Sequence, residues 1–289
     1  MILVTGASGK TGRAVIAALA ARGAGVRALV HRAEAGAGVL AAGAKEVVVG
    51  DMLVADTLHA ACRGAAAVYH ICPNMHTGEV AMAGALLAAM AQASVKRLVY
   101  HSVLHPQVEA MPHHWRKLRV EELLFTGDVQ WTILQPAAYM QNVFAYWQTI
   151  VEEGVYRVPY AVTARLGMVD LEDVAAAASV VLLDGGHEYA IYELAGPEIL
   201  DQVQIAAVLT QQIGRPVRAE AIDRVHWAES ARRAGQRAEA VDTLRRMFEY
   251  YERYGFFGNP TVLKALLGRD PATFAQVVAR HIQAWRPGS

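Results

Sequence analysis

Residues 1–12 read MILVTGASGKTG and combine two glycine patterns that bind phosphate groups. The letters GKT match the end of a Walker A loop, whereas Gly6, Gly9 and Gly12 have the spacing of a dinucleotide-binding turn. A Walker A loop needs its first glycine where this chain has Val4, inside an apolar run. The glycine triplet directly follows that run and opens a helix-like segment, so this stretch predicts a dinucleotide site.

The chain beyond this turn alternates short β-branched runs with longer Ala- and Leu-rich segments. Such alternation is typical of right-handed βαβ units that build one parallel sheet. Strands are predicted at Ile2–Thr5, Val26–Val30, Glu46–Val49, Ala67–Ile71, Arg97–His101 and Trp131–Leu134. Helices are predicted at Gly12–Arg22, Ala55–Arg63, Val80–Ala93 and His114–Phe125. The expected fold class is α/β, a doubly wound parallel-sheet Rossmann fold.

The pattern loosens after residue 142 and becomes mainly helical from Ala221 onward. Further elements are predicted as strands at Gly167–Val169 and Tyr189–Glu193 and as a helix at Leu171–Leu183, entered through Asp170. We therefore expect an NAD(P)-binding Rossmann domain over residues 1–154 and a smaller, mainly helical C-terminal substrate lobe over residues 155–289. Elements between residues 165 and 210 are expected to return to the first domain.

Composition narrows the class of partner. The chain has 289 residues, of which 54% are hydrophobic, and its 27 basic residues balance 27 acidic ones. A net charge of zero gives no field to hold nucleic acid or an anionic membrane, so a small molecule is the expected partner. The N-terminus has no basic segment before a long apolar run, and no apolar run is long enough to span a membrane, so we expect a cytoplasmic protein. The sequence does not decide whether the protein forms a homodimer, because helices at an interface resemble any other amphipathic helix.

The second predicted strand should indicate which nicotinamide cofactor is preferred. An acidic residue at its end would bind the adenosine ribose of NAD, but the chain has His31 and Arg32 there. Arginine suits the 2′-phosphate of NADP, although a solvated surface arginine is the alternative reading. NADP(H) is therefore the preferred prediction and NAD(H) stays open. Asp51, after the third strand, is expected either to accept from the adenine amino group or to cap the following turn.

Several segments occur in an order that resembles the NmrA-like family of atypical short-chain dehydrogenases/reductases. They are VTGASGKTG, VVVGDM, RLVYHSV, and KLRVEELL with WTILQPAAYMQN, followed by LEDVAAAA and YELAGPE. The resemblance covers most of the chain. It implies an extended Rossmann domain with an NADP-type cofactor across the carboxyl ends of the strands, and a small C-terminal lobe over the nicotinamide.

The resemblance also implies which residues contact the cofactor. The pyrophosphate would meet Gly6, Ser8, Gly9, Lys10, Thr11 and Gly12. The remaining parts of the cofactor would lie near His31 and Arg32 at the ribose 2′-position, Asp51 and Met52 at the adenine, and Pro73 and Asn74 at the nicotinamide ribose. Tyr139 and Asn142 would pass close to the nicotinamide, with core packing and a helix cap as their alternative roles.

The catalytic residues depart from the wider family pattern. Short-chain dehydrogenases use a serine, and a tyrosine four residues before a lysine that also holds the ribose. Ser102 and Lys117 match that pattern, but His113 occupies the tyrosine position. These three residues are the catalytic candidates, with His113 as a proton donor in place of tyrosine.

Two other chemistries find little support in the sequence. His101, His105, His113 and His114 cluster along the chain, but no H-E-x-x-H motif or neighbouring cysteine accompanies them, so no metal site is expected. No G-x-S-x-G motif surrounds Ser102, which argues against a serine hydrolase. The aromatic residues of the C-terminal region would suit a flat apolar substrate, although aromatic residues at helical spacing are more often core.

Three functions are compatible with these features. The favoured one is an NAD(P)H-dependent reductase that transfers hydride to a quinone, an aromatic polyketide or another flat conjugated molecule, because such acceptors stabilise their own reduced anion. The second is a non-catalytic NADP(H)-binding redox sensor, which would explain the missing tyrosine. The third is a biosynthetic oxygenase or isomerase on the same scaffold, since a fold does not fix its chemistry.

Overall fold

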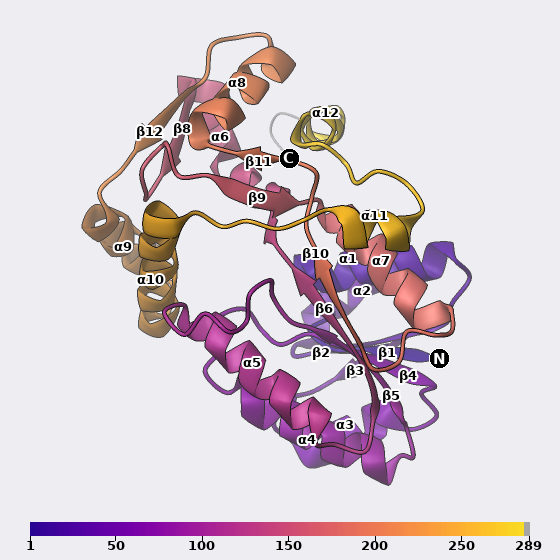
Figure 1. Ribbon diagram of the computed structural model, residues 1–289. Coiled ribbons are helices and arrows are strands. Elements are labelled where there is room, and N and C mark those ends of the chain that lie inside the picture. Colours follow the sequence, from indigo (N-terminus) through magenta and orange to yellow (C-terminus); the bar gives the residue numbers. More distant parts are fainter. Residues whose placement is uncertain (286–289) are drawn as a thin grey trace.

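A seven-stranded parallel sheet forms the centre of the computed structural model, which describes residues 1–285 (Figure 1). The strand order is β10-β6-β5-β4-β1-β2-β3. The strands span β1 Ile2–Val4, β2 Val26–Val30, β3 Glu46–Val49, β4 Ala67–His70, β5 Arg97–His101, β6 Gln130–Pro136 and β10 Ala190–Leu194. The strand order reverses between β1 and β4, because β2 and β3 are added on one side of β1 and the later strands on the other. Ligands of such sheets bind at the carboxyl ends of the strands at this switch point.

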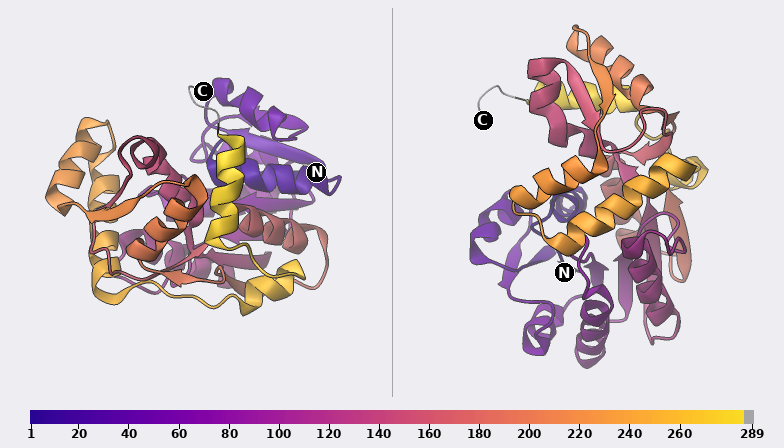
Figure 2. Two further views of the ribbon diagram at one scale, coloured as in Figure 1. Left: turned by 90° about the horizontal axis from the view of Figure 1, so that it is seen from above. Right: turned by 90° about the vertical axis from the view of Figure 1, so that its left-hand side faces the viewer.

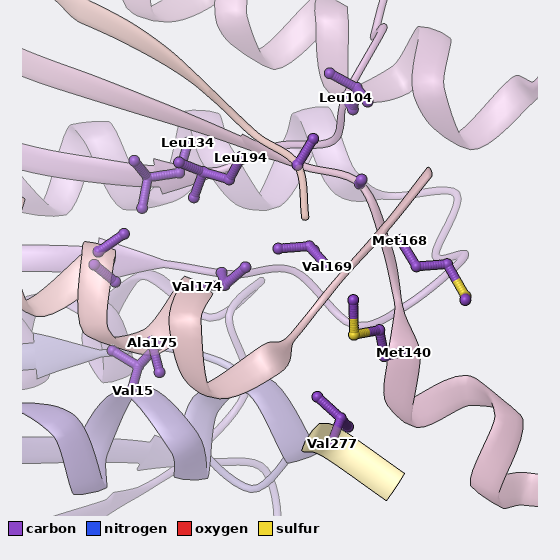
Figure 3. Close-up of a cluster of buried hydrophobic side chains, with 14 of the residues drawn as sticks. Val15, Leu104, Leu134, Met140, Met168, Val169, Val174, Ala175, Leu194 and Val277 are labelled. Atoms are coloured by element: carbon purple, nitrogen blue, oxygen red, sulfur yellow. The ribbon is translucent and has the colours of Figure 1, made fainter. Parts of the chain in front are cut away.

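Helices cover both faces of the sheet, as the near-continuous apolar strands require. One face carries α1 Lys10–Ala21, the short helices η1 Ala33–Ala35 and α2 Gly36–Ala41, and α7 Leu171–Leu183. The other face carries α3 Ala55–Cys62, α4 Glu79–Gln92 and α5 Pro112–Phe125. Figure 3 shows the first of these two cores, where Val15 of α1 faces Ala175 of α7 below Leu134 and Leu194 of the sheet.

The C-terminal lobe lies at the end of the sheet away from the N-terminus (Figures 1 and 2). Its strands form a three-stranded sheet, β11-β9-β7, and a two-stranded sheet, β12-β8. The elements are β7 Ala138–Tyr139, η2 Met140–Tyr146, α6 Trp147–Glu153, β8 Val155–Val158, β9 Leu166–Val169, β11 Ile199–Leu200, α8 Gln202–Ile213, β12 Arg218–Ala221, α9 Arg224–Arg233 and α10 Ala238–Tyr254.

The last two helices are α11 Thr261–Leu267, which packs on α7, and α12 Phe274–Ala284, which packs on α8 of the lobe (Figures 1 and 2). Two buried carboxylates of the α7 segment hold this part of the chain. Arg269 donates to Asp173 over 2.6 Å and Arg280 donates to Asp170 over 2.7 Å. Among the described residues, no helix is both long and apolar enough to cross a membrane.

The sequence-based expectations for the fold class are confirmed, and all six predicted strands of the first half occur within about two residues of their predicted ends. A seventh strand, β10, joins the sheet beside β6 although it comes from the second half of the chain. Helix α2 was not predicted, because its sequence GAGVLA contains two glycines and only six residues. The proposed domain boundary at residue 154 stays a prediction.

Candidate cofactor and substrate site

The turn between β1 and α1 has no room for a side chain at Gly6 or Gly12. Gly6 has a φ of +56°, and a Cβ there would lie 2.6 Å from the carbonyl oxygen of Ile71. A Cβ on Gly12 would lie 2.5 Å from the carbonyl oxygen of Gly6. Gly9 is the N-cap of α1 and supplies no side-chain cap, so the first amide groups of this helix stay available to an anion.

A cavity of about 420 Å³ opens beside this turn. Six of its lining residues were predicted to contact the cofactor: Gly6, Ser8, His31, Asp51, Met52 and Pro73. Leu29, Gly50, Leu53, His76 and Met82 complete the wall. The sequence did not indicate His76 or Met82, because nothing in their local pattern separates them from an ordinary loop and helix face.

Of the residues expected near the adenosine, His31, Asp51 and Met52 line this cavity, and Arg32 follows His31 in the chain. His31 and Arg32 follow β2 and are exposed, and Arg32 makes no ion pair within residues 1–285. Asp51 accepts a hydrogen bond from the backbone N–H of Leu53 over 2.8 Å, so its side chain caps the turn after β3, as one of the two alternatives predicted. Met52 is buried against the neighbouring core.

The segment after β6 is held against the start of α1. Lys10 donates to the side-chain oxygen of Asn142 over 2.7 Å, and its ammonium group lies 5.6 Å from the centre of the Tyr139 ring. Thr11 lies 3.4 Å from the Tyr139 hydroxyl. Burial lowers the pKa of Lys10. The structure therefore brings together Lys10, Thr11 and Tyr139, and with them Asn142, which was also expected near the nicotinamide.

A chain of hydrogen bonds continues from Tyr139 into the sheet. Its hydroxyl lies 2.8 Å from Nε2 of His101, and the hydroxyl of Tyr69 lies 2.5 Å from Nδ1 of the same ring. Burial lowers the pKa of His101 to about 3, so the imidazole is neutral and has one N–H. One tyrosine must therefore donate to the ring and the other must accept from it.

Lys117 is paired with an acidic residue that the sequence analysis missed. Its ammonium group lies 2.6 Å from Oε1 of Glu79 and donates to the carbonyl oxygen of His101 over 3.2 Å. Tyr100 donates to the same Glu79 oxygen over 3.0 Å. Glu79 is 3% exposed, so Lys117 neutralises a carboxylate that burial would otherwise disfavour. The only local feature of the sequence that could have pointed to Glu79 is its place at the start of an otherwise apolar helix, α4.

Ser102 bonds to a different carboxylate, Glu121. It is 2% exposed, and its hydroxyl donates to the buried Glu121. Gln135 donates to both oxygens of the same carboxylate over 2.9 and 3.0 Å. Burial raises the pKa of Glu121. In this arrangement the Ser102 hydroxyl donates its hydrogen bond to Glu121.

His113 lies one helical turn before Lys117, so both side chains leave α5 on the same face. It is 7% exposed, and its Nδ1 has no hydrogen-bond partner. Its pKa lies well below the usual range, chiefly because the ring is buried and further because His114, Lys117 and Arg116 are close. His113 is therefore a neutral imidazole with an unused nitrogen.

The other histidines pack rather than gather as ligands. His105 and His114 contact the ring of Phe256 edge-on, and Nδ1 of His114 lies 3.1 Å from the carbonyl oxygen of His105. Within residues 1–285, no three His, Cys, Asp or Glu side chains are placed to hold a metal ion. Three of the lobe aromatics are core as well, because Phe248, Tyr251 and Phe256 are buried.

The model of the NmrA-like family matches residues 1–276 of this chain. The chain belongs to the NmrA-like family. It is 30% identical to an NAD(P)H azoreductase from Xenophilus azovorans, with 99% of both chains covered. It is 32% identical to a (4-alkanoyl-5-oxo-2,5-dihydrofuran-3-yl)methyl phosphate reductase from Streptomyces griseus subsp. griseus, over 99% of this chain and 100% of the relative. The predicted family is confirmed.

Solved structures share the architecture of this NmrA-like protein. An NADPH-dependent quinone oxidoreductase from Escherichia coli, complexed with NADPH, superposes with a TM-score of 0.85 at 26% identity. The match covers 98% of this chain and 100% of the other. A Citrobacter triphenylmethane reductase superposes with a TM-score of 0.84 at 20% identity, which shows the shared fold.

Proposed function

We propose that this NmrA-like protein is an NADPH-dependent reductase that transfers hydride to a quinone, an aromatic polyketide or a similar flat conjugated acceptor. The comparisons confirm the enzyme class and the nicotinamide cofactor, because the relatives matched along their whole length are NAD(P)H-dependent or named reductases. The substrate and the residue roles that follow are our proposal.

The observation that carries the cofactor assignment is the close-packed glycine turn at the N-terminal end of α1. Gly6 and Gly12 exclude any Cβ there, and the cavity beside the turn is lined by the residues expected at the adenosine. A pyrophosphate would fit against the first amide groups of α1, with Lys10 and Thr11 at its edge. Reduced nicotinamide, when bound, supplies the hydride for the reaction.

Lys117 and His113 have different roles at the nicotinamide end of the site. The Glu79 carboxylate fixes the Lys117 ammonium beside the carbonyl oxygen of His101, where it can donate to a ribose hydroxyl. Neutral His113, on the same face of α5, can donate a hydrogen bond to the acceptor oxygen. A conjugated acceptor needs no stronger acid, because orientation supplies most of the rate and the reduced anion is delocalised.

A non-catalytic redox sensor is the second candidate, and one observation favours it. Ser102, at the expected catalytic position, donates its hydrogen bond to Glu121, and no tyrosine precedes Lys117 at the usual spacing. A sensor would bind NADPH without oxidising it.

One experiment separates the two candidates. The protein is mixed with NADPH and, separately, with NADH, together with a panel of quinones and aromatic ketones, and the loss of reduced-nicotinamide absorbance is followed. Turnover identifies a reductase and its preferred cofactor, whereas tight NADPH binding without oxidation identifies a sensor. His113→Phe then tests the donor, since loss of turnover with unchanged NADPH affinity supports it and full turnover removes it from the mechanism.

A further inference from the structure

Arg116 has buried guanidinium nitrogens without any partner. Its Nε and Nη2 atoms are shielded from solvent and make no hydrogen bond. Its helical neighbours are matched to acids, because Lys117 pairs with Glu79 and Arg119 pairs with Glu122. Within residues 1–285, no carboxylate lies within ion-pair distance of Arg116. The arginine is therefore an uncompensated cation in the described part of the chain.

A second unused polar group lies one turn away on the same helix. His113 precedes Arg116 by three residues, a spacing that makes helical side chains neighbours. His113 is 7% exposed and its Nδ1 has no partner. Buried polar atoms in folded proteins nearly always find a partner, so two unpartnered groups at one place indicate a position that a ligand fills.

The charges of the neighbouring residues indicate that this ligand is an anion. The cationic groups of Arg116 and Lys117 both lower the pKa of His113, and Lys117 alone is balanced by a carboxylate. Arg116 is half-buried, and its shielded Nε and Nη2 atoms lack acceptors, so an oxyanion would supply both the missing acceptor atoms and a compensating charge. Arginine presents a planar fork that suits sulfonate, carboxylate and phosphate groups alike.

Arg116 and His113 lie on the same helix as Lys117, which is expected at the nicotinamide end of the site. Arg116 is adjacent to Lys117 in the sequence, and the first turns of α5 pack beside α10 of the C-terminal lobe (Figure 1). An acceptor that reaches the nicotinamide end at Lys117 and His113 would therefore extend toward Arg116 between the sheet and the lobe.

We propose that Arg116, one turn from His113 on the same helix, binds an oxyanion substituent carried by the conjugated acceptor, so that the preferred substrates are anionic. The substituent is a sulfonate, carboxylate or phosphate ester on the flat ring system or on a short arm attached to it. This inference rests on the proposed reductase function and specifies, in addition, that the preferred acceptor is anionic.

The test compares two acceptors that differ only in charge, 1,4-naphthoquinone and 1,4-naphthoquinone-2-sulfonate, with NADPH as donor. Arg116→Gln should raise KM for the sulfonate about 10- to 100-fold, the loss expected when charge-assisted hydrogen bonds are removed. KM for the neutral quinone and for NADPH should stay unchanged. The control is Arg119→Gln, which removes an exposed arginine one turn away and should affect neither acceptor. Equal effects of Arg116→Gln on both acceptors, or none, would overturn the proposal.

A binding measurement tests the anion site independently of whether the protein is a reductase. Calorimetry with naphthalene-2-sulfonate and NADP⁺-loaded protein needs no turnover. Wild-type protein should bind the sulfonate and Arg116→Gln should bind it at least about tenfold more weakly. Absent or equal binding refutes the anion site whether or not quinones are reduced. Arg116→Met should keep or raise Tm, because it removes an unpaired cation, and a lower Tm would instead identify a structural arginine.

Discussion

The hydroxyl of Tyr139 lies 2.8 Å from Nε2 of His101, and this contact joins the segment after β6 to the end of β5. The opposite nitrogen of the ring lies 2.5 Å from the hydroxyl of Tyr69 in β4. One neutral imidazole thus links β4 and β5 of the central sheet to β7, the short strand that follows β6. Because both ring nitrogens are occupied, His101 has a fixed orientation and holds Tyr139 against Lys10 and Thr11.

Removal of the Tyr139 hydroxyl should destabilise the protein. Tyr139→Phe leaves a buried nitrogen of His101 without a partner, and we expect a loss of about 1–3 kcal/mol in the free energy of unfolding. Urea unfolding measures it. Tyr254→Phe is the control, because that ring is 54% exposed and should change stability by less than about 0.5 kcal/mol. Equal stability of the two variants would show that the Tyr139–His101 contact contributes nothing.

A carboxylate at the glycine turn should prevent cofactor binding. A Cβ at Gly9 would lie 3.4 Å from its nearest neighbour, the carbonyl oxygen of Gly6, so Gly9→Asp can fold. Its charge would face the pyrophosphate, and we expect NADPH affinity to fall about 10- to 1000-fold, as like charges at about 4 Å imply. Fluorescence titration measures the affinity. Gly185→Asp, at a site with open space, should bind NADPH normally, and unchanged affinity of Gly9→Asp would remove the cofactor assignment.

The choice between NADP and NAD should depend on Arg32. Arg32→Ser is expected to raise KM for NADPH about 10- to 100-fold while KM for NADH stays the same, since only NADPH carries the 2′-phosphate. Steady-state kinetics with both cofactors measures this ratio. Arg246→Ser removes an exposed arginine of α10 and serves as the matched control. A parallel loss for both cofactors would contradict the assigned role.

Stability should decrease as the solution becomes acidic. Burial lowers the pKa of His70 and His101 to about 3 and that of His114 to about 4, whereas unfolded histidine titrates near 6.5. The unfolded chain therefore binds more protons below about pH 6.5, so each neutral histidine stabilises the fold fully above that pH and progressively less toward pH 4. Each should contribute a slope of up to about 1.4 kcal/mol per pH unit.

Urea unfolding at pH 7 and pH 5 checks this dependence. His114→Asn should make it shallower, whereas His226→Asn, on an exposed face of α9, should leave it unchanged. A free energy of unfolding that is the same at both pH values would contradict buried neutral histidines.

The sequence by itself determined the features that depend on neighbouring residues along the chain. The glycine spacing after β1 specified the turn, because only Gly6 and Gly12 leave room for the backbone to close. Alternating apolar runs specified six strands of the parallel sheet. Asp170 specified the start of α7, where its side chain accepts from the N–H of Glu172.

Only the tertiary structure decided the partners of the site residues. Glu79 meets Lys117 across 38 residues of sequence, Tyr69 meets His101 across 32, and Lys10 meets Asn142 across 132. Ser102 illustrates the limit, because its position after β5 is readable while its hydrogen bond to Glu121 of α5 is not. Such contacts depend on strand order, on helix packing and on side-chain rotamers, and these are fixed when separate segments pack around one core rather than by local residue pattern.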